Sequence, residues 1–184
     1  MSAIKEIYAV IWMGPYSSLE EVCEREGSVN CCLYLIVGRL PYERAIGIKY
    51  VGITKRAPNK RLVDKDHQIK QEEIKGKKYW VGRFSVSSYN NLEPKRNRKR
   101  AELIETLLVR YLSNITNEKM INVKKTLSDP KTPIGIISRW QRKYSEDSRY
   151  NKPRVLAKLP DTLIYSDKEF WSADKMRFTL YTAE

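Results

Sequence analysis

The sequence has few of the features that mark several classes of protein. Its 184 residues include three cysteines, Cys23, Cys31 and Cys32, whose spacing matches no set of metal ligands. Reduced, buried thiols are expected, as in a cytoplasmic protein. No apolar run approaches the roughly 20 residues that a membrane-spanning helix needs, and Ile7–Met13 is too short for a signal peptide. The sequence therefore predicts a soluble, intracellular protein.

Negative charge is also scarce. The chain has 35 Lys and Arg against 22 Asp and Glu, so its formal net charge is +13 and its isoelectric point is near 9.6. Residues 54–110 hold sixteen Lys or Arg against seven Asp or Glu, which is nine of the thirteen net positive charges. A surface this positive gains free energy by releasing counterions from phosphates. The expected partner is therefore a nucleic acid.

Two short apolar strands are predicted close together in the chain. Residues 33–37 and 48–53 are β-branched or aromatic runs bounded by turn residues. Each contains one tyrosine, Tyr34 in the first and Tyr50 in the second. Strands this close in sequence pair most simply as antiparallel neighbours. A third strand is predicted over 78–88, where apolar residues alternate.

Other elements are predicted around these strands. A strand is expected over 7–12, and residues 17–21 resemble a helix start, with capping serines followed by glutamates in the first turn. Longer helices are expected over 58–75, where Pro suits the first turn, and over 95–112. A short helix-like segment follows at 134–140.

Several short motifs follow one another in a fixed order along this region. They are Cys32-Leu33-Tyr34, Tyr50-Val51-Gly52-Ile53-Thr54, Arg61-Leu62, Glu105 followed by the apolar Leu107-Leu108-Val109, and Asn117 twelve residues after Glu105. This set resembles the GIY-YIG nuclease family over residues 31–122, half of the chain. Cys32 stands where the family's first motif has glycine.

The resemblance implies a site that hydrolyses phosphodiester bonds. Such a reaction needs an activated water, a cation near the non-bridging oxygens and donors for the charge that develops. The residues that the resemblance assigns to these roles are Tyr34 and Tyr50 for the water and the phosphate, Arg61 for the developing charge, His67 as a base or phosphate contact, Glu105 for Mg²⁺ (or Mn²⁺), and Asn117 to brace the site.

Several of these assignments have alternatives. Glu102 is a second candidate for the metal, and Asn122 is a second candidate for the brace if the intervening loop is longer. His67 lies six residues after Arg61, which places the two about 120° apart on a regular helix, so it is equally a surface histidine. Each tyrosine alone could be an ordinary strand aromatic with its hydroxyl in water.

The basic residues near the motifs are the expected contacts for the DNA backbone, which position nucleic acid without reading its sequence. Five cations within 95–100, at the start of the predicted helix, oppose the helix dipole at a cost of about a few tenths of a kcal/mol each. That arrangement favours a phosphate nearby. The expected contacts are Lys60, Lys77, Lys78, Arg83, Arg96, Arg98, Lys99 and Arg100.

The sequence thus predicts an α/β core with a small, mainly antiparallel three-stranded sheet flanked by helices. This GIY-YIG-like nuclease core spans 31–123, after an N-terminal extension (1–30) and before a basic, aromatic C-terminal addition (124–184) packed on it. The expected activity is metal-dependent hydrolysis of double-stranded DNA by a restriction-type or phage-related endonuclease, by analogy. A palindromic target would imply a homodimer.

Two other functions fit the same residues. One is a non-catalytic nucleic-acid-binding protein that keeps the scaffold and the charge. The other is an RNase, for which exposed aromatic side chains would stack on unpaired bases. Its candidate stacking residues are Trp80, Trp140 and Trp171.

Overall fold

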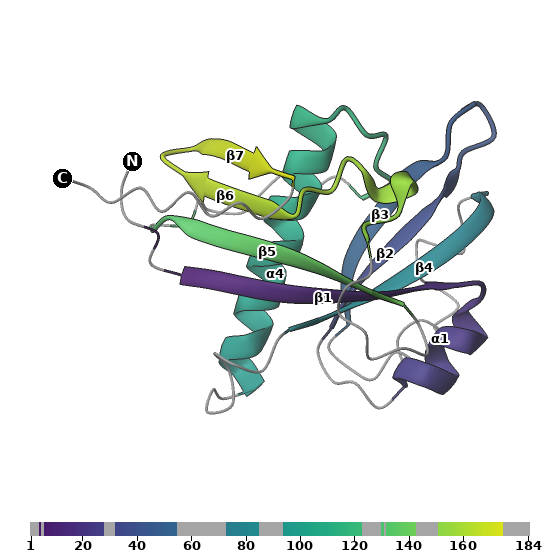
Figure 1. Cartoon of the computed structure of the whole chain (residues 1–184), viewed down its shortest axis with the longest axis horizontal. Helices are drawn as coiled ribbons and strands as arrows, with labels where there is room; N and C mark the ends of the chain where they lie inside the picture. Colours follow the sequence, from purple (N-terminus) through teal and green to yellow (C-terminus); the bar gives the residue numbers. More distant parts are fainter. Residues whose placement is uncertain are drawn as a thin grey trace.

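The computed structural model describes residues 4, 6–27, 32–54, 73–84, 94–122, 130, 132–142 and 151–174, with the backbone alone over 94–97. Within these residues seven strands form one curled sheet in the order β3-β2-β4-β1-β5-β6-β7 (Figure 1). The strands are β1 (Glu6–Tyr16), β2 (Cys32–Arg39), β3 (Gly47–Thr54), β4 (Lys75–Phe84), β5 (Ile134–Arg142), β6 (Thr162–Ser166) and β7 (Glu169–Ala173). The helices are α1 (Leu19–Glu26) and α4 (Pro94–Arg110), with short turns η2 (Tyr111–Ile115) and η3 (Arg154–Leu156).

The expectation of a small three-stranded sheet flanked by helices is wrong. The three predicted strands correspond to β2, β3 and β4, which are antiparallel neighbours. However, β1 pairs with the other edge of β4, and β5 pairs in parallel with β1. The structure is therefore mostly sheet, because the chain on both sides of these strands adds four more strands to the sheet, while one helix, α1 or α4, packs on each face.

The helix-like segment at 134–140 is strand β5. Ile134 and Ile136 lie in the core, and the strand follows β1 in register from Glu6 to Gly14. A short apolar run is compatible with either a helix or a strand when judged by periodicity alone. Residues 134–142 form a strand because they pair with the edge of β1 that β4 leaves free.

Two other predicted helical segments, the helix start at 17–21 and the helix over 95–112, are confirmed. Ser18 caps α1 by accepting a hydrogen bond from the Glu21 amide, and the Glu21 carboxylate accepts one from the Ser17 amide. α4 covers most of the helix predicted over 95–112. The helix predicted over 58–75 lies outside the described residues except for 73–75. Neither described helix is long and apolar enough to cross a membrane.

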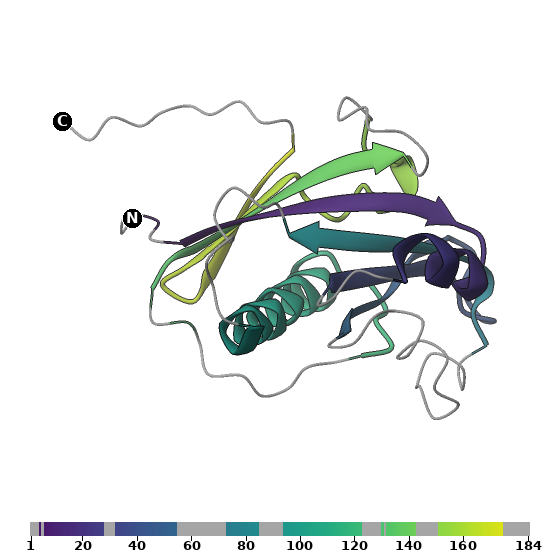
Figure 2. The same ribbon diagram turned by 90° about the horizontal axis from the view of Figure 1, so that it is seen from below.

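The sheet has two faces, which we call the α4 face and the α1 face after the helix that packs on each. Figure 2 shows α4 inside the curve of the sheet. Side chains alternate between the faces along β2 and β4. Leu33, Leu35 and Trp80 pack with Ile104, Leu107 and Leu108 on the α4 face, while Tyr34, Ile36, Tyr79 and Val81 pack with Tyr16 and Val22 on the α1 face.

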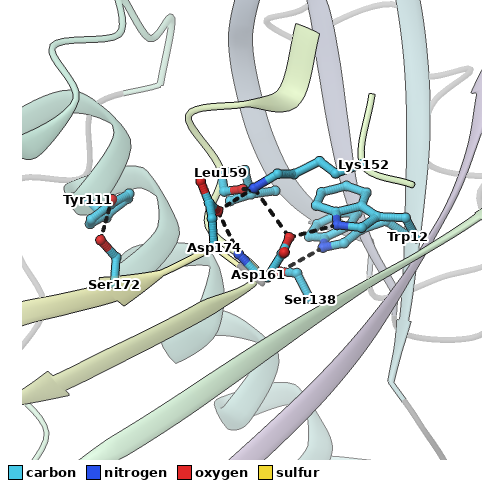
Figure 3. A network of polar contacts seen from close by, with 9 residues as sticks. Trp12, Tyr111, Ser138, Lys152, Leu159, Asp161, Ser172 and Asp174 are labelled. Carbon is cyan, nitrogen blue, oxygen red and sulfur yellow. Dashed lines mark hydrogen bonds and ion pairs between the residues drawn. The ribbon is translucent and has the colours of Figure 1, made fainter. Parts of the chain in front are cut away.

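Polar contacts tie the C-terminal strands to the rest of the sheet (Figure 3). The Asp161 carboxylate accepts a hydrogen bond from the Trp140 indole at 3.1 Å and pairs with Lys152 at 3.2 Å. The Tyr111 hydroxyl at the start of η2 donates to Ser172 on β7 at 3.0 Å. These contacts join β5 to the loop before β6, and η2 to β7.

Candidate active site

The structure brings Tyr34 and Tyr50 together. Their rings come from the adjacent strands β2 and β3 and stack with centroids 5.6 Å apart and planes inclined by 13°. Tyr34 is 3% exposed and Tyr50 is partly exposed, and both pack on the α1 face. Two phenol rings are therefore held side by side on the α1 face.

Gly52 makes this stack possible. It is the cross-strand partner of Tyr34 in β3. A Cβ atom placed on Gly52 would lie 2.4 Å from the Tyr34 ring, 2.5 Å from its hydroxyl and 2.5 Å from the Tyr50 ring. Real Cβ atoms essentially never come this close to other heavy atoms. The glycine in the second motif is therefore explained by the space that the two tyrosines occupy.

A buried carboxylate lies on the same face and was not expected from the sequence. Glu26 is 2% exposed, accepts a hydrogen bond from the Tyr16 hydroxyl at 2.5 Å, and is bound by the Arg83 guanidinium through Nε at 2.8 Å and through Nη2. Burial, this hydrogen bond and the carboxylate charge raise the pKa of Tyr16 far above its ordinary value. The one signal in the sequence was an acid four residues after Val22, on the buried side of α1.

Arg83 lies on the same face as the tyrosine pair, where it binds Glu26, and the register of β2 and β4 places it next to Tyr34. Tyr34 pairs with Val81 on β4, so Arg83 is its diagonal neighbour on the α1 face, about 7 Å away between backbones. The Arg83 side chain is 41% exposed while its partner Glu26 is buried. This arginine was expected to contact DNA, and it lies on the face that holds both tyrosines.

The two candidate metal ligands lie in different environments. Glu105 is 4% exposed in the buried half of α4. Glu102 is partly exposed and pairs with Arg98 one helical turn earlier, at 3.1 Å. Among the described residues, no group of three or more His, Cys, Asp and Glu side chains could hold a metal ion.

The tyrosine pair and the apolar side of α4 lie on opposite faces of β2. Ile104, Leu107 and Leu108, which flank Glu105 along the helix, pack on the α4 face with Leu33 and Leu35. Helix α4 makes its main sheet contact with β3, the edge strand that also carries Tyr50. Glu105 and the two tyrosines could therefore contact the same substrate only if that substrate extends around the edge of β3.

The structure distinguishes the two asparagines. Asn122 is buried, and its side chain accepts a hydrogen bond from the Val51 amide at 3.3 Å and donates one to the Val51 carbonyl. It thus pairs with the open edge of β3 next to Tyr50. Asn117, the preferred candidate, is exposed with φ of 53° in the loop after η2. Of the two, Asn122 is the one that braces the strand.

Apart from Arg83, which pairs with Ile11 in the middle of β1, the expected DNA contacts on described residues form two groups at opposite ends of that strand. At one end, on α4, lie Arg98, Lys99 and Arg100, with the Arg100 guanidinium 5.9 Å from the centre of the Tyr8 ring. At the other end lie Lys77 and Lys78, and Lys78 donates to Ser17 at 3.1 Å. Nine residues of extended chain separate Tyr8 from Ser17, which is about 30 Å.

The remaining candidate residues either lie outside the described residues or are the tryptophans proposed to stack on RNA bases. Lys60, Arg61 and His67 lie outside the described residues, as does the side chain of Arg96. Of the aromatic residues proposed to stack on RNA bases, Trp80 and Trp140 are buried at 2% and 6% exposure, whereas Trp171 is 45% exposed. The two buried indoles are core residues and cannot serve as stacking surfaces in this fold.

Comparison of the chain with protein-family models, with curated proteins and with solved structures gave no match.

Proposed function

We propose that this protein is a divalent-metal-dependent DNA endonuclease whose reaction site is built on Tyr34 and Tyr50. The observation that supports this most is the stacked pair of phenols at 5.6 Å over Gly52, from two strands that match the order of the nuclease motifs. The net charge of +13 supports a polyanionic substrate. The resemblance to GIY-YIG nucleases supplies the chemistry.

The two hydroxyls would act on the water and on the phosphate. One would orient the attacking water and accept its proton, and the other would donate a hydrogen bond to a non-bridging oxygen. A free tyrosine has a pKa of about 10, so the base needs neighbouring positive charge. Arg83 on the same face is already paired with Glu26, so the proposed sources of that charge are the metal ion and Arg61. Arg61 is also the proposed donor for the charge that develops in the transition state.

Glu105 is the proposed ligand for Mg²⁺, with Mn²⁺ as a substitute. A carboxylate is the hard oxygen donor that Mg²⁺ prefers, and water would complete the coordination because the ion dehydrates reluctantly. Bound there, the ion would neutralise phosphate charge and lower the pKa of a coordinated water. Asn122 would support the site by holding β3 in place through its two hydrogen bonds to the Val51 backbone.

The test is nicking of supercoiled plasmid in Mg²⁺ by the native protein and by Tyr34→Phe, Tyr50→Phe, Arg61→Ala and Glu105→Gln. Phenylalanine keeps the stacked rings and removes the hydroxyl, so we expect losses of about 10²–10⁴-fold in rate with the fold unchanged. Tyr79→Phe is the matched control, since Tyr79 is another buried tyrosine of the α1 face. Native protein that leaves plasmid intact in Mg²⁺ and Mn²⁺ across pH 6–9 would exclude this function.

A non-catalytic nucleic-acid-binding protein is the second candidate. The observation that favours it is the position of α4, whose apolar side lies on the face of β2 opposite to Tyr34. Such a protein would bind DNA with a steep salt dependence and cut none. Binding without nicking, equal in native protein and Glu105→Gln, would identify it.

A further inference from the structure

A pocket of about 390 Å³ lies at the end of the β2–β3 hairpin, apart from the tyrosine pair. It is walled by the hairpin loop 42–46, the start of β3, the loop 117–119 after η2, and Lys158 after η3. Its size falls in the range of small-molecule sites, about 300–1,000 Å³. From Gly47 at the pocket to Tyr50 is three residues of extended chain, or about 10 Å.

A buried lysine sets the geometry of this pocket. Lys49 is 2% exposed, and its ammonium lies 2.7 Å from Glu43 and 3.7 Å from Glu118. Glu118 also pairs with Lys158 at 3.0 Å. Burial raises the pKa of Glu43, but the hydrogen bonds from Lys49 and the Leu40 amide and nearby positive charge bring it below its ordinary value. The Glu43 carboxylate is thus charged, and both carboxylates are already paired with lysines.

The cations of the pocket outnumber its acids. Arg44, Lys49, Lys119 and Lys158 face Glu43 and Glu118, which leaves a net charge of +2. Arg44 is exposed and makes no hydrogen bond or ion pair with any described residue. More positive side chains lie at this end of the sheet, since Arg39 pairs with Lys75 across β2 and β4. The pocket therefore favours an anion.

An aromatic side chain stands at the rim of the pocket. Tyr42 is 72% exposed, and the Lys119 ammonium lies 5.2 Å from the centre of its ring. The lysine stands over one face of the ring, so the other face is open to a stacking partner. Ile46, 58% exposed, adds apolar surface beside it. An anion that also has a flat ring would use both features.

We propose that this pocket binds one unpaired nucleotide of the DNA next to the bond that is cut. The base stacks on Tyr42, and the phosphate is bound by Arg44 with Lys119 and Lys158. This inference rests on the proposed function, since it places the nucleotide about 10 Å along β3 from the reaction site. It adds a preference for DNA that contains an unpaired nucleotide, such as an overhang or a flap.

The test is fluorescence-polarisation binding without divalent metal, which is independent of cleavage. Labelled duplexes with a blunt end or a single unpaired nucleotide are compared. Stacking of one base is worth about 5- to 150-fold in affinity, so native protein is expected to prefer the unpaired end by about tenfold. Tyr42→Ala should bind both duplexes equally. Arg44→Ala should weaken binding and reduce the slope of log K against log salt by about 1.

Matched controls are Trp171→Ala on β7 and Arg139→Ala on β5, an exposed aromatic and an exposed cation outside the pocket. Both should keep the preference. In competition, a deoxynucleoside monophosphate should displace the unpaired-end duplex more strongly than inorganic phosphate does.

The outcomes separate the two proposals. Equal binding of both duplexes by native protein, or a preference that survives Tyr42→Ala, overturns the nucleotide pocket even if plasmid is nicked. Equal competition by inorganic phosphate also overturns it, because the site would then recognise the anion alone. If native protein prefers the duplex with an unpaired nucleotide and Tyr42→Ala loses that preference, the nucleotide pocket is supported. If the same native protein leaves plasmid intact in Mg²⁺, the nuclease function is wrong while the pocket stands.

Discussion

At the scale of single residues, Gly52 leaves no room for one added methyl group. In Gly52→Ala the new Cβ would meet ring atoms of Tyr34 and Tyr50 at 2.4–2.5 Å. Both rings are packed against neighbours, so the stack must open or β3 must shift. Overpacking of this kind costs about 1–3 kcal/mol. We expect urea unfolding to show a loss of stability of that size.

Gly135→Ala is the matched control, because it also adds a methyl group to a strand. Its Cβ would meet Ile4 and Ile7 at 3.6 Å, an ordinary van der Waals distance. Its stability should stay within about 0.5 kcal/mol of the native value. Equal losses in the two variants would show that the tyrosine stack does not depend on Gly52.

Tyr16 should make stability fall at high pH. Burial and the hydrogen bond to Glu26 raise its pKa in the folded state, while the unfolded tyrosine ionises near pH 10. The raised pKa means that the folded state retains the proton longer, so stability is full below about pH 10 and falls as pH rises above it. One such group contributes at most about 1.4 kcal/mol per pH unit.

The measurement is the free energy of unfolding in urea at pH 9, 10 and 11, for native protein and Tyr16→Phe. The variant should lose less stability than native protein between pH 10 and 11. Some dependence should remain, because burial also raises the pKa of Tyr79. Parallel pH profiles for the two proteins would contradict the proposed role of the Tyr16 hydroxyl.

At the scale of elements, β3 is an edge strand that Asn122 closes at one point. Its side chain satisfies both the amide and the carbonyl of Val51. In Asn122→Ala these two buried groups lose their partner, which costs about 1–3 kcal/mol. We expect a matching loss of stability in urea and faster hydrogen exchange at the Val51 amide.

Asn117→Gly is the control for this prediction. Asn117 is exposed with φ of 53°, a conformation that glycine adopts without strain. Stability and exchange at Val51 should stay close to native values. If Asn117→Gly also accelerated exchange at Val51, the brace would not be specific to Asn122.

The strands differed in how well the sequence alone could predict them. The β2–β3 hairpin was predictable because both strands and both tyrosines lie within about twenty residues, so local pattern and pairing agree. Strand β5 was not, because its apolar residues fit a helix as well as a strand until β1 lies beside it. Glu26 and Asn122 act through partners 57 and 71 residues away, a distance that no local pattern reports.

At the scale of the whole molecule, β1 joins the two halves of the sheet. It pairs antiparallel with β4 on one side and parallel with β5 on the other. Its Tyr8, Val10 and Trp12 belong to the α4-face core. The strands that hold the tyrosine pair are therefore continuous with strands from both ends of the chain, and the candidate site depends on the complete sheet.

A fragment of residues 31–123 should therefore not fold by itself. It would leave one edge of β4 unpaired and would remove the core side chains that β1, β5 and β6 supply to α4, among them Trp12, Trp140 and Tyr165. We expect no cooperative urea transition and no fixed near-ultraviolet circular dichroism. A fragment of residues 4–174 keeps every described element and is the comparison that should still unfold cooperatively. If 31–123 unfolded cooperatively, the tyrosine hairpin would be an independent unit and the other four strands would only be attached to it.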